Sequence, residues 1–238
     1  MERPPCMISP PFSASPARCA RRRGGFTLTE LLVALAILAV LIALLMPTLS
    51  VVQSRGRSSK CLSNLQQLAA AWGMYTGENG GRLVESNSGW ARGGNTLAAI
   101  EQGDLFPYVK NTAVYRCPSD ESDHLRSYSM SGKLGSVSGG KPPVVATLSA
   151  IPNPARTLLL IEENDPRGFN MGSWIIGGGS SWIDFCPAWH DNGANMAFAD
   201  GHAAYRRWVD PRTPLIKSFF MSTPGNPDLQ FLQSVFLP

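Results

Sequence analysis

The feature that most constrains the fold is a long apolar run near the amino terminus. Sixteen consecutive residues, Leu31 to Met46, are apolar, and the 21 residues from Phe26 to Met46 contain a single charge, that of Glu30. As an α-helix this stretch extends about 31 Å, close to the roughly 30 Å hydrocarbon core of a bilayer. The run therefore predicts a helix that crosses a membrane once.

The distribution of charge predicts how that helix is oriented. Residues 1–25 contain five arginines and one glutamate, whereas the rest of the chain holds 16 basic and 16 acidic residues. Basic residues in front of a membrane helix stay in the cytoplasm, so the body of the chain is expected on the other side. Because that body is neutral and has no basic stripe, we expect no binding to nucleic acid.

A cleaved secretory signal is the main alternative for the apolar run. The run is longer than the usual signal core of about 7 to 15 residues, and no A-x-A cleavage site follows it. Glu30 also argues against a signal, because a carboxylate inside an apolar helix costs free energy and by default indicates a function. A structural explanation exists too, since Thr27 and Glu30 have the spacing of a capping box. From these residues alone, the cap and a functional role stay equally open.

A second helical pattern follows the apolar run. Pro47 is expected to kink or loosen the helix, because it lacks a backbone N–H. Apolar residues then recur at spacings of three and four from Leu62 to Tyr75, before the glycines at 77, 80 and 81. We therefore expect a membrane or fibre-core helix over residues 26–47, its amphipathic continuation over 48–77, and a globular head over 78–238.

Two segments of the head have clear strand patterns. Residues 156–164, RTLLLIEEN, predict a central strand, and the acids Glu162 and Glu163 are expected to be solvated at its end. Residues 188–208 contain the turn dipeptides Asn192-Gly193 and Asp200-Gly201, which predict a three-stranded antiparallel meander with two-residue turns.

This register assigns side chains to the two faces of the meander. Met196 then faces Tyr205, and the face that carries both is expected to pack on the long helix. The opposite face would carry His190, Asn195 and Arg206 in one cross-strand row.

A metal site or an active site in the meander would have to combine His190 and Asp191 with Asp200 and His202. Asp200 would lie about 20 Å from the Asn192-Gly193 end of an extended strand, too far to share an ion with His190. We therefore expect no metal, no cofactor and no catalytic residue here. Turn geometry is a sufficient explanation for Asp200 and Gly201.

The cysteines of the body favour a disulfide over a metal site. Cys61, Cys117 and Cys186 are odd in number and show no CxxC or Cys/His zinc spacing. If the body is exported, one disulfide and one free thiol is the simplest arrangement. We expect the disulfide to join Cys61 and Cys117.

Gly25 followed by FTLTELL resembles the processing site of type IV prepilins and type II secretion pseudopilins. The pattern of that site is a basic leader, a glycine, an aromatic residue and an acid at the fifth place after the glycine. The resemblance implies that residues 1–25 are a leader, removed by a prepilin peptidase between Gly25 and Phe26, and that Phe26 is then N-methylated. Glu30 would be the acid that pairs with the amino terminus of a neighbouring subunit.

His190, nine further residues and then Asp200-Gly201 resemble the H-X9-DG pattern of a large group of bacterial prepilin-like proteins. The stretches KCLSNLQQLAAAWGMY and YRCPSD are similar to that group as well. The resemblance implies an α+β, pilin-like fold, in which a long amino-terminal helix packs on an antiparallel sheet near the carboxyl terminus.

These observations lead to three hypotheses. The first is a non-enzymatic pseudopilin with its amino terminus in the cytoplasm and its head in the periplasm or outside the cell. Through an inner-membrane assembly platform it would join other pseudopilin subunits in a type IV pilus or type II secretion-like pseudopilus. The second is a membrane-tethered module whose exposed tryptophans bind a ligand or glycan. The third and weakest is a metal-dependent hydrolase.

Overall fold

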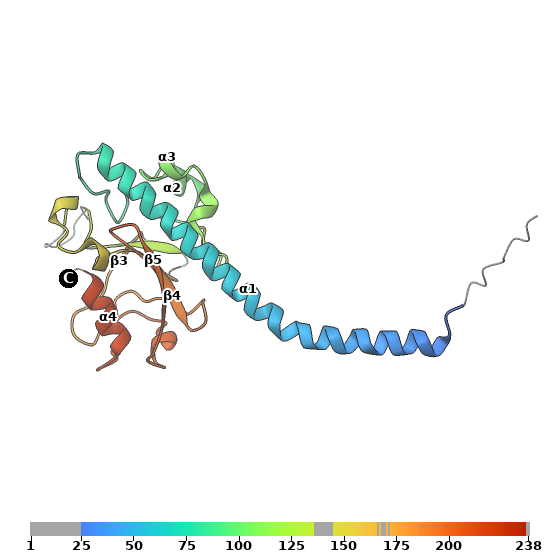
Figure 1. Ribbon diagram of the computed structural model, residues 1–238. Helices are drawn as coiled ribbons and strands as arrows, with labels where there is room; N and C mark the ends of the chain where they lie inside the picture. The colour runs from blue at the N-terminus through green and yellow to red at the C-terminus, as the bar shows by residue number, and fades with distance from the viewer. Residues whose placement is uncertain (1–24, 136–144, 166, 168–169, 171, 237–238) are drawn as a thin grey trace, which may run out of the picture. The chain divides into compact units, whose positions relative to one another are not determined.

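The computed structural model describes residues 25–135, 145–165, 167, 170 and 172–236 (Figure 1). At position 45 and positions 47–50 it describes the backbone alone. Of the expected leader, residues 1–24 lie outside the described residues. The chain divides into two units, one up to Pro47 and one from Thr48 onward; the second unit, which includes the latter part of the long amino-terminal helix, is called the head below.

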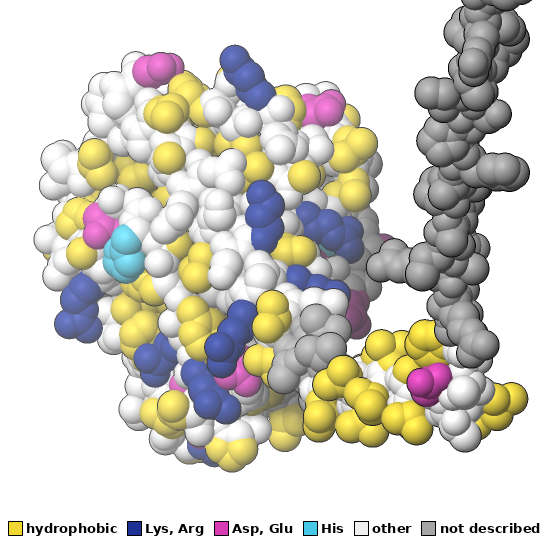
Figure 2. Space-filling view, turned by 45° about the vertical axis from the view of Figure 1, so that its right-hand side comes forward, with side chains coloured by type: hydrophobic (Ala, Val, Ile, Leu, Met, Phe, Trp, Pro, Cys, Tyr) yellow, Lys and Arg dark blue, Asp and Glu magenta, His cyan; other side chains and the backbone are white. Residues whose placement is uncertain are grey.

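Helix α1, Leu28–Glu78, is 51 residues long and belongs to both units. Its backbone is helical through position 47, where the proline was expected to disturb it. In the first unit its large apolar side chains are exposed, and hydrophobic side chains cover this part of the helix in Figure 2. Among the residues described, no helix combines the length and apolarity that a membrane crossing requires.

The second part of α1 has the buried face that its sequence pattern predicts. Leu65, Leu68 and Trp72 follow one another at spacings of four or fewer and are at most 2% exposed. The helix then ends at paired glycines, where Gly80 and Gly81 adopt positive φ values of 65° and 81°. The N–H of Gly81 donates to the carbonyl of Thr76 at 2.8 Å, which satisfies one of the open carbonyls of the last turn.

Five strands of the head form one sheet in the order β3-β1-β2-β4-β5. The strands are β1 Tyr128–Ser131, β2 Leu158–Glu162, β3 Ser173–Trp174, β4 Gly193–Phe198 and β5 Ala203–Arg207. Neighbouring strands are antiparallel except for β1 and β3. The predicted α+β class is confirmed, as is a central strand within residues 156–164.

The two faces of the sheet pack against different helices (Figure 1). One core joins Leu65 and Trp72 of α1 to Leu160 and Ala197 of the sheet. The other core lies on the side of α4, Pro227–Phe236. The shorter helices are α2 Leu97–Glu101, α3 Phe106–Val109, η1 Thr112–Tyr115, η2 Leu148–Ala150, η3 Pro154–Arg156 and η4 Thr213–Leu215.

The hairpin of β4 and β5 differs from the prediction by one residue of register. Met196 pairs with Ala204, and Asn195 pairs with Tyr205. The loop has three residues between Phe198 and His202, not two, and Gly201 takes its last position with φ 95°. A three-residue hairpin loop that ends in a left-handed residue produces this shift.

The predicted faces were wrong for Met196 and Phe198 of β4, whereas Tyr205 lies on the α1 side as predicted and lines a cavity with Ser58. Met196 and Phe198 belong to the core on the α4 side. Asn195 and Ala197 lie toward α1, where the Asn195 amide donates to Ser58 Oγ at 3.4 Å. The expected first strand of the meander is absent among the described residues, because the chain turns at His190 to Asn192 with positive φ at Asp191 and Asn192.

Candidate functional site

The start of α1 carries the capping box that its sequence predicts. The N–H of Thr27 donates to Glu30 Oε2 at 2.9 Å, and the N–H of Glu30 donates to Thr27 Oγ1 at 3.2 Å. The Thr27 hydroxyl also donates to Glu30 Oε2, at 2.7 Å. Phe26, directly before this box, is 81% exposed, and Glu30 is exposed as well. The acid thus has a structural role, and it remains accessible to a partner.

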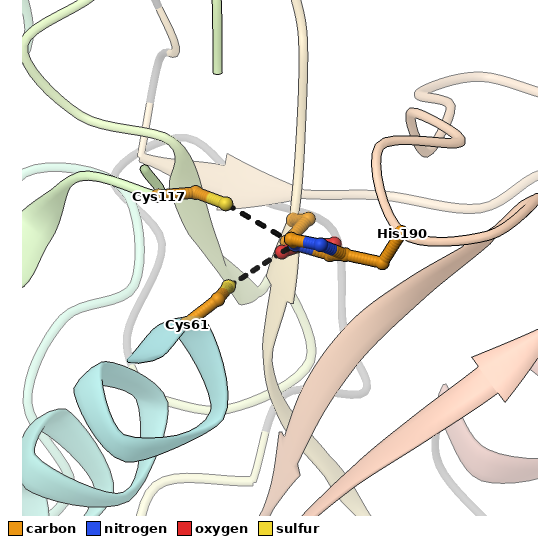
Figure 3. Close-up of side chains that lie close together, drawn as sticks. Cys61, Cys117 and His190 are labelled. Carbon is orange, nitrogen blue, oxygen red and sulfur yellow. Dashed lines mark hydrogen bonds and ion pairs between the residues drawn. The ribbon is translucent and has the colours of Figure 1, made fainter. Parts of the chain in front are cut away.

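A buried group of four side chains lies within the head. Cys61 comes from α1, Cys117 follows η1, Glu162 ends β2, and His190 lies in the turn before β4. Each offers one ligand atom, and these atoms all lie within 4.8 Å of one another. None of the four residues is more than 1% exposed. Figure 3 shows Cys61 and Cys117 pointing toward the imidazole of His190 from two different segments. We call these four residues the tetrad.

Hydrogen bonds join the members of the tetrad. The Cys61 thiol donates to Glu162 Oε1 at 2.6 Å, and His190 Nε2 lies 2.8 Å from the same oxygen. Cys117 Sγ lies 3.2 Å from His190 Nε2. Burial alone would lower the pKa of His190, but its bonds to Cys117 and Glu162 prevail and raise that pKa to about 9. Burial raises the pKa of the Cys61 thiol, whereas the hydrogen bond from Cys61 lowers the pKa of Cys117.

Polar groups surround the tetrad and fix its side chains. The Tyr128 hydroxyl lies 3.1 Å from Cys61 Sγ, and the N–H of Ser119 donates to Cys117 Sγ at 3.4 Å. The backbone N–H of Asn195 donates to Glu162 Oε2 at 2.8 Å. His190 Nδ1 lies 3.5 Å from the hydroxyl of Ser119. Each of the four side chains therefore has a polar contact with a residue outside the tetrad.

The tetrad does not have the geometry of a thiol–imidazole–carboxylate relay. In such a relay the base contacts the nucleophile through one ring nitrogen and its orienting carboxylate through the other. Here Cys117 and Glu162 both contact Nε2 of His190. The arrangement resembles a set of metal ligands more closely than a nucleophile with its base.

The disulfide expected between Cys61 and Cys117 is not formed in the structure, where Cys61, Cys117 and Cys186 are all free thiols. The expected proximity of the first two cysteines is correct. Besides each other, the thiols contact the two other members of the tetrad, Cys61 with Glu162 and Cys117 with His190.

Asp200 of the H-X9-DG pattern lies away from the tetrad, and so does His202. Asp200 and His202 form their own pair at the β4–β5 loop, with 2.6 Å between Asp200 Oδ1 and His202 Nδ1. Both side chains are exposed by more than a third. His190 thus belongs to a different cluster from Asp200, as the sequence predicts. It does not share a row with Arg206, which lies over the ring of Phe231 in α4.

Sequence reasoning missed the role of Glu162, which was expected to be a solvated acid. The residue is 0% exposed, and Glu163 beside it is 2% exposed. The signal that could have found the tetrad is the position of its other three members. Cys61, Cys117 and His190 each lie in one of the three head segments that resemble prepilin-like proteins, KCLSNLQQLAAAWGMY, YRCPSD and H-X9-DG.

A cavity of about 730 Å³ lies beside His190. Its lining includes Ser58 and Ser59 of α1, together with Asp191 and Tyr205 of the sheet side. His190 is thus the member of the tetrad that lines this cavity.

A second group of buried polar side chains lies beyond β2. Asp184 is 6% exposed, and its Oδ2 accepts a hydrogen bond from the N–H of Ile175 at 2.7 Å. Burial raises the pKa of Asp184 to about 6. Nearby, Glu163 Oε2 accepts from the Ser129 hydroxyl, and Arg126 donates to the carbonyl of Asn170. Burial also raises the pKa of Glu163.

The tryptophans, some of which the glycan-binding hypothesis requires to be exposed, are mostly core residues. Trp189 is partly buried, and the other five are at most 2% exposed: Trp72, Trp90, Trp174, Trp182 and Trp208. Their packing does not favour a surface for stacking on sugar rings.

Comparison with known proteins gives one match. Residues 20–46 match the family model of the prokaryotic N-terminal methylation motif. No curated protein and no solved structure matches the chain. The matched range includes Gly25, Phe26 and Glu30 and excludes the H-X9-DG pattern. The match supports a type IV prepilin-like protein, of the pilin or pseudopilin kind, and with it a structural subunit attached to a membrane.

Proposed function

We propose that this chain is a pseudopilin, a structural subunit that is inserted in the inner membrane and assembled into a type IV pilus or a type II secretion-like pseudopilus. The observation that carries the proposal is the methylation motif at residues 20–46, which contains the expected cleavage point, the new amino terminus and the acid. A prepilin peptidase would cut between Gly25 and Phe26 and methylate Phe26. The exposed position of Phe26 before α1 suits such processing.

Membrane insertion follows from the sequence of the same region. The residues from Leu31 to Met46 are apolar without interruption, and the large apolar side chains described in this range are 46% to 67% exposed. A helix that is apolar all round requires an apolar environment, either lipid or neighbouring helices in a fibre. The arginines before Gly25 favour a cytoplasmic amino terminus and a head in the periplasm or outside the cell.

Assembly would use the carboxylate of Glu30. In the single chain, one oxygen of this carboxylate accepts the capping bonds from Thr27. A carboxylate has about four lone-pair sites, so Glu30 can accept the methylated amine of a neighbour's Phe26 as well. Such a pair would neutralise both charges in the apolar fibre core, where an unpaired charge is costly. The implied partners are the prepilin peptidase, other pseudopilin subunits and the inner-membrane assembly platform.

Two substitutions separate the cap from the assembly role. Glu30→Gln keeps a side chain that can complete a capping box but removes the charge. Thr27→Ala removes the Thr27 hydroxyl and keeps the acid, at a cost of about 0.5–2 kcal/mol in helix stability. We expect Glu30→Gln to reach the membrane, and we expect its amount in sheared fibres to fall tenfold or more. A loss of about 1.4 kcal/mol of pairing free energy corresponds to a tenfold change.

The matched variant Thr27→Ala should assemble at near wild-type level in the same fibre preparation. Quantitative immunoblots of membrane and sheared-fibre fractions measure both variants. Equal incorporation of Glu30→Gln and wild type would show that the acid serves the cap alone and would contradict the assembly role.

A further inference from the structure

We propose that Cys61, Cys117, Glu162 and His190 bind one Zn²⁺ and form a structural metal site in the head. The inference rests on the tetrad, and it is independent of whether the subunit assembles into a fibre. It replaces the expectation of a disulfide between Cys61 and Cys117.

The donor set suits zinc. Zinc in proteins is held by thiolate, imidazole and carboxylate, and structural sites have four protein ligands in a tetrahedron. The tetrad supplies two sulfurs, one nitrogen and one oxygen, all buried. A mixed set of this kind favours zinc over calcium or magnesium, which prefer oxygen ligands alone. With four protein ligands the site is closed, which indicates a structural role.

The spacing of the donor atoms is compatible with one ion. Zinc lies about 2.3 Å from sulfur and about 2.0–2.2 Å from nitrogen or oxygen, so tetrahedral ligands are roughly 3.3–3.8 Å apart. The four ligand atoms of the tetrad lie within 4.8 Å of one another. The closest pair, Cys61 Sγ and Glu162 Oε1 at 2.6 Å, must separate by about 1 Å, which a small side-chain rotation provides.

The surroundings of the tetrad match those of metal ligands. Ligands in metal sites are oriented by hydrogen bonds from a second layer of groups. The N–H of Ser119 donates to Cys117 Sγ, and the N–H of Asn195 donates to Oε2 of Glu162, while Oε1 contacts Cys61. His190 Nδ1 faces the Ser119 hydroxyl, which leaves Nε2 toward the sulfurs. These contacts orient the ligand atoms toward a common centre.

The connectivity indicates what the metal would do. The contact of Cys61 with Glu162 joins positions 101 residues apart, and that of Cys117 with His190 joins positions 73 apart. One ion would tie α1, the segment after η1, strand β2 and the turn before β4 to a single centre. Because an unfolded chain has no such site, the free energy of metal binding would stabilise the folded head.

The test uses the full chain purified in detergent without added chelator. Elemental analysis should find about one Zn²⁺ per chain, and denatured protein should titrate with free thiols at Cys61 and Cys117. Replacement of Zn²⁺ by Co²⁺ should give the visible absorption of tetrahedral, thiolate-bound cobalt. A chelator should lower the Tm, and one equivalent of Zn²⁺ should restore it.

Matched variants locate the site. Cys117→Ser and His190→Gln should reduce bound Zn²⁺ by tenfold or more, whereas Cys186→Ala and His202→Gln should keep it at the wild-type level. Cys186 is a buried free thiol, and His202 is a histidine of the same signature outside the tetrad. If the ligand variants fail to fold, the cobalt spectrum of the wild-type chain by itself shows whether thiolates bind the metal. Wild-type protein that binds neither ion, or that contains a Cys61–Cys117 disulfide by peptide mass, overturns the proposal.

Discussion

At the scale of single residues, two acids in this chain show how burial changes what a carboxylate does. Glu30 is exposed and caps a helix, so its charge is available to a partner. Asp184 is buried, and burial raises its pKa to about 6. The first acid is suited to recognition between subunits, whereas the second makes the stability of the head depend on pH.

Because burial raises the pKa of Asp184, this residue makes the head less stable as the pH rises. Below about pH 3 the carboxyl of Asp184 is mostly protonated in both the folded and the unfolded chain, so its burial does not lower the free energy of unfolding. As pH rises from about 4 to 6, the unfolded chain loses the proton more readily, and the folded state is destabilised. The difference of about two pKa units corresponds to at most about 3 kcal/mol above pH 6.

Asp184→Asn should remove this cost and still accept the hydrogen bond from Ile175. We expect the variant to be more stable than wild type at pH 7.5, with a gain in the free energy of unfolding that is larger by about 1–3 kcal/mol than at pH 4. Denaturant titrations followed by tryptophan fluorescence measure the free energy of unfolding at each pH. Asp123 is exposed, so Asp123→Asn is the control for the loss of one charge. A difference that is the same at both pH values would contradict the assignment.

At the scale of elements, apolar residues at spacings of three and four predicted the second part of the long helix, and a continuous apolar run predicted the central strand. Leu65, Leu68 and Trp72 face the core, and Leu158 to Glu162 are all buried. The register of β4 and β5 was wrong, because Asp200-Gly201 can end a three-residue loop as well as form a two-residue turn. The shift of one residue changed which residues of β5 share a face with Met196 and Asn195 of β4.

That loop depends on the left-handed backbone of Gly201, at φ 95°. A Cβ at this position would meet no atom within 4 Å, so the cost of Gly201→Ala is conformational and should be about 1–2 kcal/mol in the free energy of unfolding. Gly73→Ala is the matched control, since this exposed glycine lies within α1 and its Cβ also meets nothing within 4 Å. It should leave stability unchanged or raise it by about 0.5–1 kcal/mol. Equal effects of the two substitutions in thermal unfolding would refute this account of the loop.

At the scale of the whole molecule, the amino-terminal motif and the tetrad differ in how much the sequence reveals. The motif is local, so Gly25, Phe26 and Glu30 could be recognised from their spacing alone. The tetrad joins residues far apart in the chain, and its distances arise only when α1 packs on the sheet. Sequence reasoning therefore identified two of its cysteines as neighbours but could not place Glu162 or His190 beside them.

The proposed function requires that the leader be removed after Gly25. The most direct test is mass spectrometry of the amino-terminal peptide of the mature protein, isolated from membranes of cells that contain a prepilin peptidase. We predict that this peptide begins at Phe26 and carries one methyl group on its amino nitrogen. A mature protein that retains the leader, or one that begins beyond Pro47, would contradict the claim.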